Sequence, residues 1–123
     1  MKRSILLLFL LAFLAYPVTN VLGKCLYGAI AYSQTTGESG VDHGYPEKEG
    51  AIDGAMRECE DSDCKCLVIV CGDCGALTRG SNGVLGMSSK CKEKEEAIRK
   101  ALDDCRKKGG VNCMLVRYVC SFW

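Results

Sequence analysis

Four cysteines stand within eleven residues of the chain, in the stretch CKCLVIVCGDCGAL at residues 64–77. Their spacing suits three kinds of chemistry: a redox centre, a zinc site or a set of structural disulfides. A redox C-x-x-C needs a helix N-terminus to stabilise its thiolate, whereas Cys71 and Cys74 are followed by GALTRGSNG, which cannot begin a helix. A zinc site needs two converging ligand pairs, and the four residues between Cys66 and Cys71 belong to a predicted strand. We therefore predict structural disulfides.

The first residues of the chain have the features of an export signal. Lys2 and Arg3 precede an unbroken apolar run at residues 5–15, and small residues at positions 21 and 23 allow cleavage before Lys24. The apolar run is shorter than the roughly 20 residues that span a bilayer, and Lys24 argues against a lipid on Cys25, so we expect no stable membrane anchor. We predict that residues 1–23 are a cleaved signal peptide and that the mature chain is secreted or periplasmic.

All ten cysteines lie in the predicted mature chain, residues 24–123. An even number of cysteines at this density in an exported chain is typical of a disulfide framework. A domain of this size buries little core, so cross-links are a plausible supplement to its stability. We predict a single disulfide-stapled domain over residues 24–123.

An internal repeat organises this domain. The segments AIDGAMREC (51–59) and AIRKALDDC (97–105) match at a distance of 46 residues, and both place apolar side chains on one helical face. The segments CKCLVIVC (64–71) and CMLVRYVC (113–120) also match and have the length and composition of strands. A hairpin with a glycine-bearing loop precedes each helix, at residues 27–45 and 74–89.

Each half, about residues 25–71 and 72–121, is therefore predicted to be a hairpin, a helix and a strand. We expect Ser88 or Ser89 to cap the second helix. The predicted fold class is α+β: the two pseudo-repeats form one antiparallel sheet of about six strands, with both helices on one face.

The repeat also predicts cysteine pairs. Cys59 and Cys105 each end a helix and Cys64 and Cys113 each open the next strand, so we predict Cys59–Cys64 and Cys105–Cys113, with Cys66 as an alternative partner of Cys59. The pairing of the other cysteines stays open, although the ends of the second hairpin and of the last strand favour Cys74–Cys120. All ten are assigned to disulfides: Cys25, Cys59, Cys64, Cys66, Cys71, Cys74, Cys91, Cys105, Cys113 and Cys120.

The motifs YGAIAYS (27–33) and CGAL (74–77), with a helix ending in cysteine in each half, resemble the exported bacterial family catalogued as domain of unknown function 4189. The resemblance covers about residues 26–121. It implies a small secreted or periplasmic domain. Some similar proteins stand beside secreted antibacterial toxins, which implies an immunity role. The chain departs from the family pattern in extra cysteines and in tryptophans replaced by Leu26 or Tyr27 and by Val84.

No acid, base and nucleophile emerge together from the sequence. His43 follows Asp42, but adjacent residues of a strand point to opposite faces, and Cys91 would need to be a free thiol to act as a nucleophile. The acidic run ECEDSDC lacks the glycine and closing glutamate of a calcium loop. We predict no catalytic residue, no cofactor and no metal.

The charge distribution divides the mature chain. Residues 24–71 carry 4 basic and 9 acidic side chains and residues 72–123 carry 10 and 6, and neither half has the basic, aromatic-rich surface of a nucleic-acid-binding protein.

Our leading hypothesis is a non-enzymatic domain that presents an open sheet face or its hairpin loops to a protein partner, in its narrowest form an inhibitor or immunity protein against a toxin or cell-wall hydrolase. The alternatives are a thiol-redox or hydrolytic enzyme using Cys71 and Cys74 or Cys91, and an exported effector that acts on a host. The sequence leaves the oligomeric state open.

Overall fold

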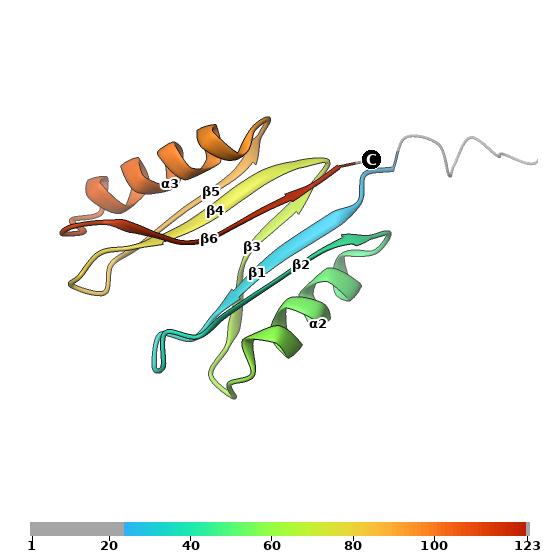
Figure 1. The fold of residues 1–123 in the computed structure, drawn as a ribbon, viewed down its shortest axis with the longest axis horizontal. Coiled ribbons are helices and arrows are strands. Elements are labelled where there is room, and N and C mark those ends of the chain that lie inside the picture. The colour runs from blue at the N-terminus through green and yellow to red at the C-terminus, as the bar shows by residue number, and fades with distance from the viewer. Residues whose placement is uncertain (1–23, 123) are drawn as a thin grey trace, which may run out of the picture.

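The computed structural model describes residues 24–122, which fold as two similar halves. The first half contains β1 (Tyr27–Tyr32), β2 (Ser39–Tyr45), α2 (Lys48–Cys59) and β3 (Lys65–Cys71). The second half contains β4 (Asp73–Arg79), β5 (Leu85–Cys91), α3 (Lys94–Lys107) and β6 (Met114–Ser121). The order hairpin, helix, strand is therefore the same in both halves, as the repeat predicts (Figure 1). The predicted signal peptide lies outside the described residues.

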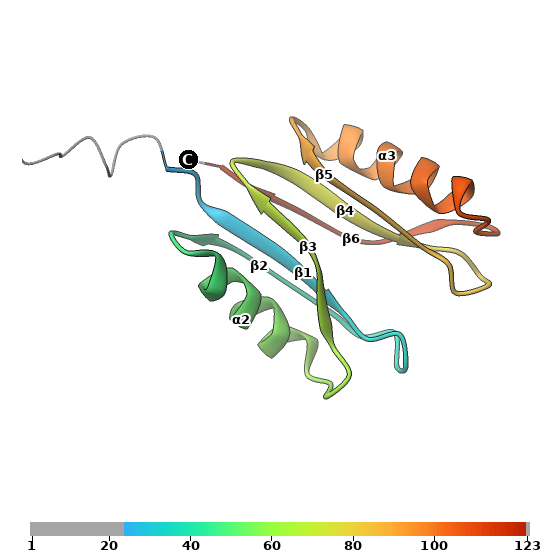
Figure 2. The same ribbon diagram turned by 180° about the vertical axis from the view of Figure 1, so that it is seen from behind.

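Each half forms its own three-stranded antiparallel sheet, with the strand orders β2-β1-β3 and β5-β4-β6. The predicted α+β class is confirmed, but the single six-stranded sheet with both helices on one face is wrong. The two sheets pack face to face, and α2 and α3 cover their outer faces, so the layers run helix, sheet, sheet, helix (Figures 1 and 2).

The central strands β1 and β4 explain this arrangement. Ala29 and Ala31 pack with the small side chains of α2, whereas Ile30, between them in the sequence, packs with Leu77 and Val119 of the other sheet. Side chains of a strand alternate between its two faces, so both faces of β1 and of β4 are apolar. One sheet with helices on only one face would expose Ile30 and Leu77, which are fully buried here.

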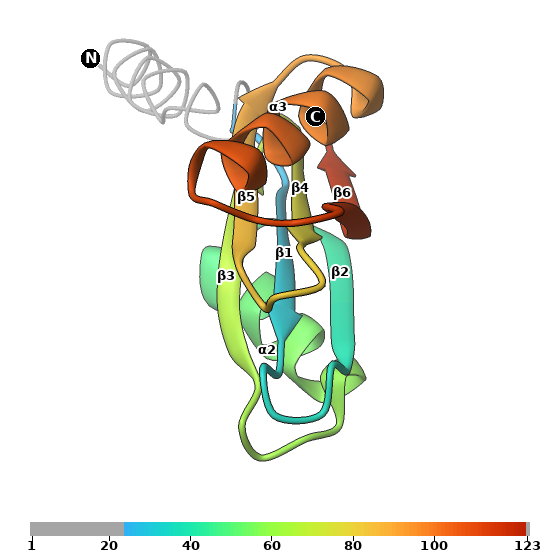
Figure 3. The same ribbon diagram turned by 90° about the vertical axis from the view of Figure 1, so that its left-hand side faces the viewer.

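The four outer strands form two pairs along the sides of the molecule. In Figure 3, β1 and β4 lie at the centre, β2 lies near β6 on one side, and β3 lies near β5 on the other. Each of these four strands has one edge that pairs with no other strand among residues 24–122. An unpaired edge presents backbone N–H and C=O groups that can accept another strand.

A helix carboxylate covers one such edge in each half. Glu58 Oε2 of α2 accepts a hydrogen bond from the Val41 backbone N–H of β2 at 3.0 Å. At the matched position of the repeat, Asp104 Oδ2 of α3 accepts from the Met87 backbone N–H of β5 at 2.8 Å. Both contacts tie a helix to the outer strand beneath it and occupy an edge amide that would otherwise be free.

Replacing Asp104 by asparagine is expected to lower the free energy of unfolding by about 1 kcal/mol at pH 7. Hydrogen bonds from Lys108 and from the Met87 backbone hold the pKa of Asp104 below its ordinary value of 3.8. A carboxyl with a lower pKa in the folded state stabilises the fold above its unfolded pKa, and this stabilisation is lost as the pH falls through the folded pKa. The difference between wild type and Asp104→Asn should therefore be constant from neutral pH to about pH 5 and shrink below about pH 4.

Urea unfolding at a series of pH values measures this difference. Asp103→Asn is the control, because the Asp103 side chain is 46% exposed and, within residues 24–122, its carboxylate pairs only with Arg106, at 3.0 Å. Exposed ion pairs contribute little to stability, so the control should change the free energy of unfolding by less than about 0.5 kcal/mol. An Asp104→Asn effect that is the same at acid and neutral pH would contradict the assigned role of the carboxylate.

Candidate protein-binding surface

Four disulfides cross-link the described residues, two in each half. The pairs are Cys25–Cys71, Cys59–Cys64, Cys74–Cys120 and Cys105–Cys113. The two short pairs join the end of each helix to the chain before the next strand, as predicted, and the partner of Cys59 is Cys64 rather than Cys66. The two long pairs each span 46 residues and close each half into a covalent loop.

The C-x-x-C motif at residues 71–74 is divided between two disulfides. Cys71 bonds to Cys25 and Cys74 bonds to Cys120, so the two cysteines of the motif are not partners. Cys74 lies within strand β4, so the motif is not followed by the helix N-terminus that a redox C-x-x-C needs. The motif therefore serves as two structural cross-links and not as a dithiol redox pair.

The prediction that all ten cysteines are paired is wrong for two of them. Cys66 and Cys91 are free thiols. Cys91 is fully buried and lies opposite Cys74 in the β4–β5 ladder, so a substrate cannot reach it. Cys66 on β3 is partly buried, and its Sγ–H donates to the Val68 carbonyl at 3.7 Å. Burial raises the pKa of the Cys66 thiol, which disfavours the reactive thiolate.

We expect the denatured, unreduced chain to react with two equivalents of an alkylating reagent, one at each free thiol. In the native chain at pH 8 only Cys66 should react, and more slowly than free cysteine, because its raised pKa reduces the thiolate fraction. Mass spectrometry of unreduced peptides identifies the labelled residues. Cys66→Ala should abolish native labelling and leave only Cys91 reactive after denaturation. Labelling at any other cysteine would contradict the pairing.

Within residues 24–122, the imidazole of the single histidine forms no hydrogen bond with a carboxylate. His43 is exposed on β2, and the neighbouring Asp42 carboxylate accepts hydrogen bonds from the Tyr45 hydroxyl at 2.7 Å and from the backbone N–H of His43 at 2.9 Å. The carboxylate is thus occupied by groups other than the imidazole. His43 instead lines the surface between β2 and β6 described below.

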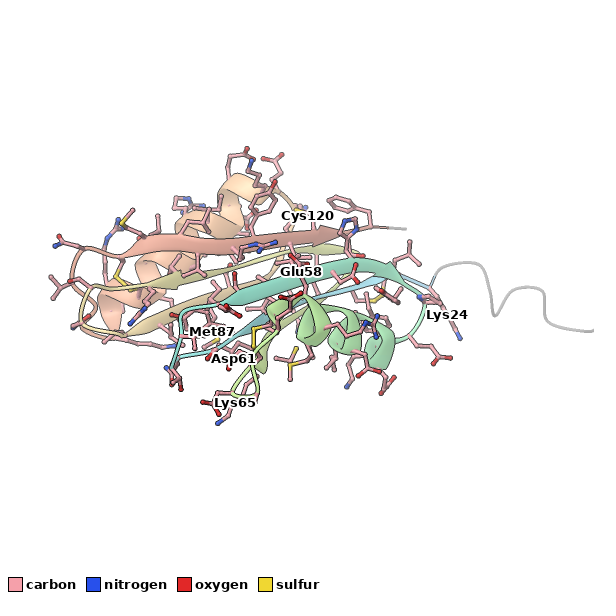
Figure 4. The ribbon with its side chains drawn as sticks, turned by 60° about the horizontal axis from the view of Figure 1, so that its bottom comes forward. Lys24, Glu58, Asp61, Lys65, Met87 and Cys120 are labelled. Atoms are coloured by element: carbon pink, nitrogen blue, oxygen red, sulfur yellow. A yellow bond between two sulfur atoms is a disulfide. The ribbon has the colours of Figure 1, made fainter. Side chains whose placement is uncertain are left out.

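The acidic turn between α2 and β3 has a structural role. Asp61 accepts a hydrogen bond from the Thr36 hydroxyl at 3.2 Å, and hydrogen bonding to Ser33 and Thr36 lowers the pKa of Asp61. These contacts tie the turn to the β1–β2 loop at one end of the molecule (Figure 4). Within residues 24–122, no three His, Cys, Asp or Glu side chains gather closely enough to hold a metal ion.

The exposed large apolar side chains concentrate on β6 and the residues next to it. They are Val111, Met114, Leu115, Tyr118 and Phe122, with exposed fractions from 40% to 71%. Elsewhere in residues 24–122, Ile69 on β3 reaches a comparable exposure, at 37%. We call residues 114–122 and their outward-facing backbone the β6 edge. Apolar side chains gathered at an unpaired strand edge are typical of an interaction site.

An open depression of about 520 Å³ lies beside the β6 edge, between β6 and β2. It is lined by Val41 and His43 of β2 and by residues 115–120 of β6. The Arg117 guanidinium links the two strands, since it donates to Glu58 Oε1 at 3.1 Å and to Ser39 Oγ at 3.5 Å. Figure 4 labels Glu58 of α2 and Cys120 of β6 on this side of the molecule.

The side chain of Lys94 lies on the opposite side of the β6 edge. The Lys94 ammonium lies 4.6 Å from the centroid of the Tyr118 ring, a cation–π contact. The predicted open sheet face is not present, because each sheet is covered by a helix on one face and by the other sheet on the second. The run MLVRYVC at residues 114–120 supplies most of the apolar side chains of the edge that is open instead, but only the strand order shows that this strand is an outer one.

Comparison with known proteins places the chain in one family. No curated protein and no solved structure matches the chain. Within residues 24–122 neither helix is long and apolar enough to cross a membrane. A family model described as "Domain of unknown function (DUF4189)" matches residues 27–120, which comprise β1 through most of β6 and include both halves of the repeat. The chain therefore belongs to the DUF4189 family.

Proposed function

We propose that this chain is an exported, non-enzymatic domain that binds a protein partner at the β6 edge. The observation that carries the proposal is the concentration of exposed apolar side chains on one strand whose outer edge is unpaired, with Met114 71% and Tyr118 40% exposed. Disulfides hold this strand at both ends, through Cys113 just before it and Cys120 within it. A rigid strand loses little conformational entropy on binding, which favours affinity.

The cysteine chemistry supports export. Disulfides persist in oxidising compartments, and four of them join eight of the ten cysteines here. The signal-like composition of residues 1–23 agrees with this compartment. We accordingly place the chain outside the cytosol, as a secreted or periplasmic protein.

A narrower form of the proposal is that the domain inhibits a secreted toxin or a cell-wall hydrolase, as an immunity protein would. The support for it is the resemblance to family members that stand beside antibacterial toxins. A shared fold does not by itself transfer a function, so the identity of a bound partner decides between this form and a domain that binds some other protein.

An affinity experiment tests the proposal. The disulfide-intact chain, immobilised through a C-terminal tag, is incubated with culture supernatant and with periplasmic extract of the source cells, and bound proteins are identified by mass spectrometry. The control is the same chain reduced and alkylated, which lacks the cross-linked framework. We expect a partner that is retained by the intact chain and not by the control. Repeated failure to recover such a partner would contradict the proposal.

A further inference from the structure

We propose that the β6 edge binds its partner by strand addition, taking an extended segment in which carboxylate side chains alternate with aliphatic ones. This inference rests on the proposed function and specifies the chemistry of the partner. In strand addition the backbone supplies the affinity and alternate side chains supply the specificity.

The backbone groups of Tyr118 and Cys120 point away from the sheet. The Cα atoms of Cys74 and Cys120 are 4.1 Å apart, a distance typical of a non-hydrogen-bonded antiparallel pair, whose N–H and C=O groups face outward. Ala76 and Tyr118, two residues along the same ladder, form the next such pair. Within residues 24–122 no hydrogen bond joins the N–H of Tyr118 or Cys120 to a side chain or a loop. Two donors at the spacing of a strand ladder are thus open to an incoming strand.

The outer edges of β2 and β5 are less open than the β6 edge. Glu58 covers the Val41 amide of β2 and Asp104 covers the Met87 amide of β5. The β2 strand has a further contact, in which the Gly44 N–H donates to Ser121 Oγ at 3.2 Å. The β3 edge bears one exposed large apolar side chain, Ile69. The β6 edge therefore combines open amides with apolar contact area.

The two sides of β6 differ in the side chains they offer. Tyr118 lies on the α3 side with Lys94 above its ring, and Lys94 forms no ion pair with any carboxylate of residues 24–122. On the other side, the depression toward β2 has aliphatic walls at Val41 and Val116. Successive side chains of an added strand would face these two sides alternately. Carboxylates suit the Lys94 side and aliphatic groups suit the depression.

Charge argues against a second copy of the chain as the occupant. Symmetric pairing of two β6 strands around Tyr118 would bring two Lys94 ammonium groups into the same interface. Like charges brought together in an interface disfavour association, whereas a carboxylate on a different partner would be attracted there. We therefore assign the edge to an acidic, extended segment of another protein.

The probes are two capped octapeptides, one alternating valine with glutamate and the other alternating valine with lysine. Binding to the disulfide-intact chain is followed by amide chemical shifts and by hydrogen exchange. We expect the glutamate peptide to shift and protect the amides of Tyr118 and Cys120 and to bind about tenfold more tightly than the lysine peptide at low salt. Shifts centred on β3 or β5, or tighter binding of the lysine peptide, would overturn the inference.

Two variants separate the backbone from the side chain. Tyr118→Ala removes the ring and keeps the outward N–H, whereas Tyr118→Pro removes the N–H as well and leaves the ladder bonds to β4, since this N–H does not point to β4. We expect Tyr118→Pro to bind the glutamate peptide about tenfold more weakly than Tyr118→Ala does. Equal binding by these two variants would overturn the inference.

A charge-reversal pair tests the site without altering β6. Lys94→Glu should weaken binding of the glutamate peptide about tenfold at low salt, and Lys48→Glu, the exposed counterpart at the start of α2, should not weaken it. This pair decides the question if circular dichroism shows that Tyr118→Pro does not fold. Equal effects of Lys94→Glu and Lys48→Glu would overturn the assignment, as would a wild-type dimer in sedimentation that Tyr118→Ala dissociates.

The outcomes distinguish this inference from the proposed function. A partner that is captured equally by wild type, Tyr118→Ala and Lys94→Glu would overturn strand addition at β6 and leave a binding function in place. Peptide binding at β6 together with the absence of any captured partner would support the edge chemistry and contradict the proposed function.

Discussion

Replacing Gly86 by alanine is expected to destabilise the fold by about 3 kcal/mol, because the added methyl group would collide with the backbone of α3. A Cβ at Gly86 would meet the Ala101 carbonyl oxygen and would lie 2.5 Å from the Cys105 nitrogen and 2.5 Å from Thr78 Oγ1. These helix atoms cannot move without shifting α3 away from the sheet. The Thr78 hydroxyl also donates to the Ala101 carbonyl at 2.7 Å, so the substitution would disturb a buried hydrogen bond.

Urea unfolding of the disulfide-intact chain measures this loss. Gly40→Ala is the equivalent substitution in the first half, where a Cβ would meet the Ala55 carbonyl oxygen and lie 2.5 Å from the Cys59 nitrogen, so a similar loss is expected. Gly83→Ala is the control: its Cβ has nothing within 4 Å, and its φ of +85° alone should give a loss of about 1 kcal/mol. Equal losses at positions 83 and 86 would contradict the close approach of α3 to β5.

The two helices and the two short disulfides could be predicted from the sequence. The alignment of residues 51–59 with residues 97–105 predicted both helices, and the structure has them at Lys48–Cys59 and Lys94–Lys107. The same alignment predicted the short disulfides, because the residues that end each helix and open the next strand recur together. Local patterns therefore determined the elements and the cross-links between neighbouring elements.

The association of the two halves is not a local property. A repeat of hairpin, helix and strand can extend one sheet or form two sheets that pack together. The apolar residues of β1 alone are compatible with both arrangements. Only the burial of both faces of β1 and of β4 requires two packed sheets.

Ser88 illustrates a smaller error of the same kind. It was predicted to cap a helix but lies in β5, where its hydroxyl accepts from the Ala76 N–H and donates to the Ala97 carbonyl. A polar residue near a helix start can bind the helix from a neighbouring strand.

The free thiols and the exposed β6 edge were also beyond sequence reasoning. An even cysteine count favours complete pairing, yet Cys91 lies beside Cys74, whose sulfur is already bonded to Cys120. The partner of Cys74 depends on which of its two neighbouring strands presents a cysteine in suitable geometry. The β6 edge likewise becomes visible only when the strand order shows that β6 is the last strand of its sheet.

Removing a long disulfide is expected to have the largest effect on stability. In the loop-entropy model, a cross-link that spans 46 residues stabilises by about 4 kcal/mol, whereas one that spans 5 stabilises by about 2 kcal/mol. We therefore expect the double variant Cys74→Ala/Cys120→Ala to lose about twice as much stability as Cys59→Ala/Cys64→Ala. A small domain has about 5–15 kcal/mol in total, so the first variant should approach the limit of folding.

The second long disulfide provides the decisive comparison, because Cys25–Cys71 spans the same 46 residues but does not involve β6. Urea unfolding should give Cys25→Ala/Cys71→Ala a loss similar to that of the Cys74 and Cys120 variant, since loop length is the same. Binding at the β6 edge should differ, because only Cys120 holds β6 against β4 next to Tyr118. If loop length governs stability, removing either long disulfide must lower the free energy of unfolding more than removing the short one does. If the disulfide at Cys120 also holds β6 in its binding geometry, only the loss of this disulfide should weaken binding of the glutamate peptide.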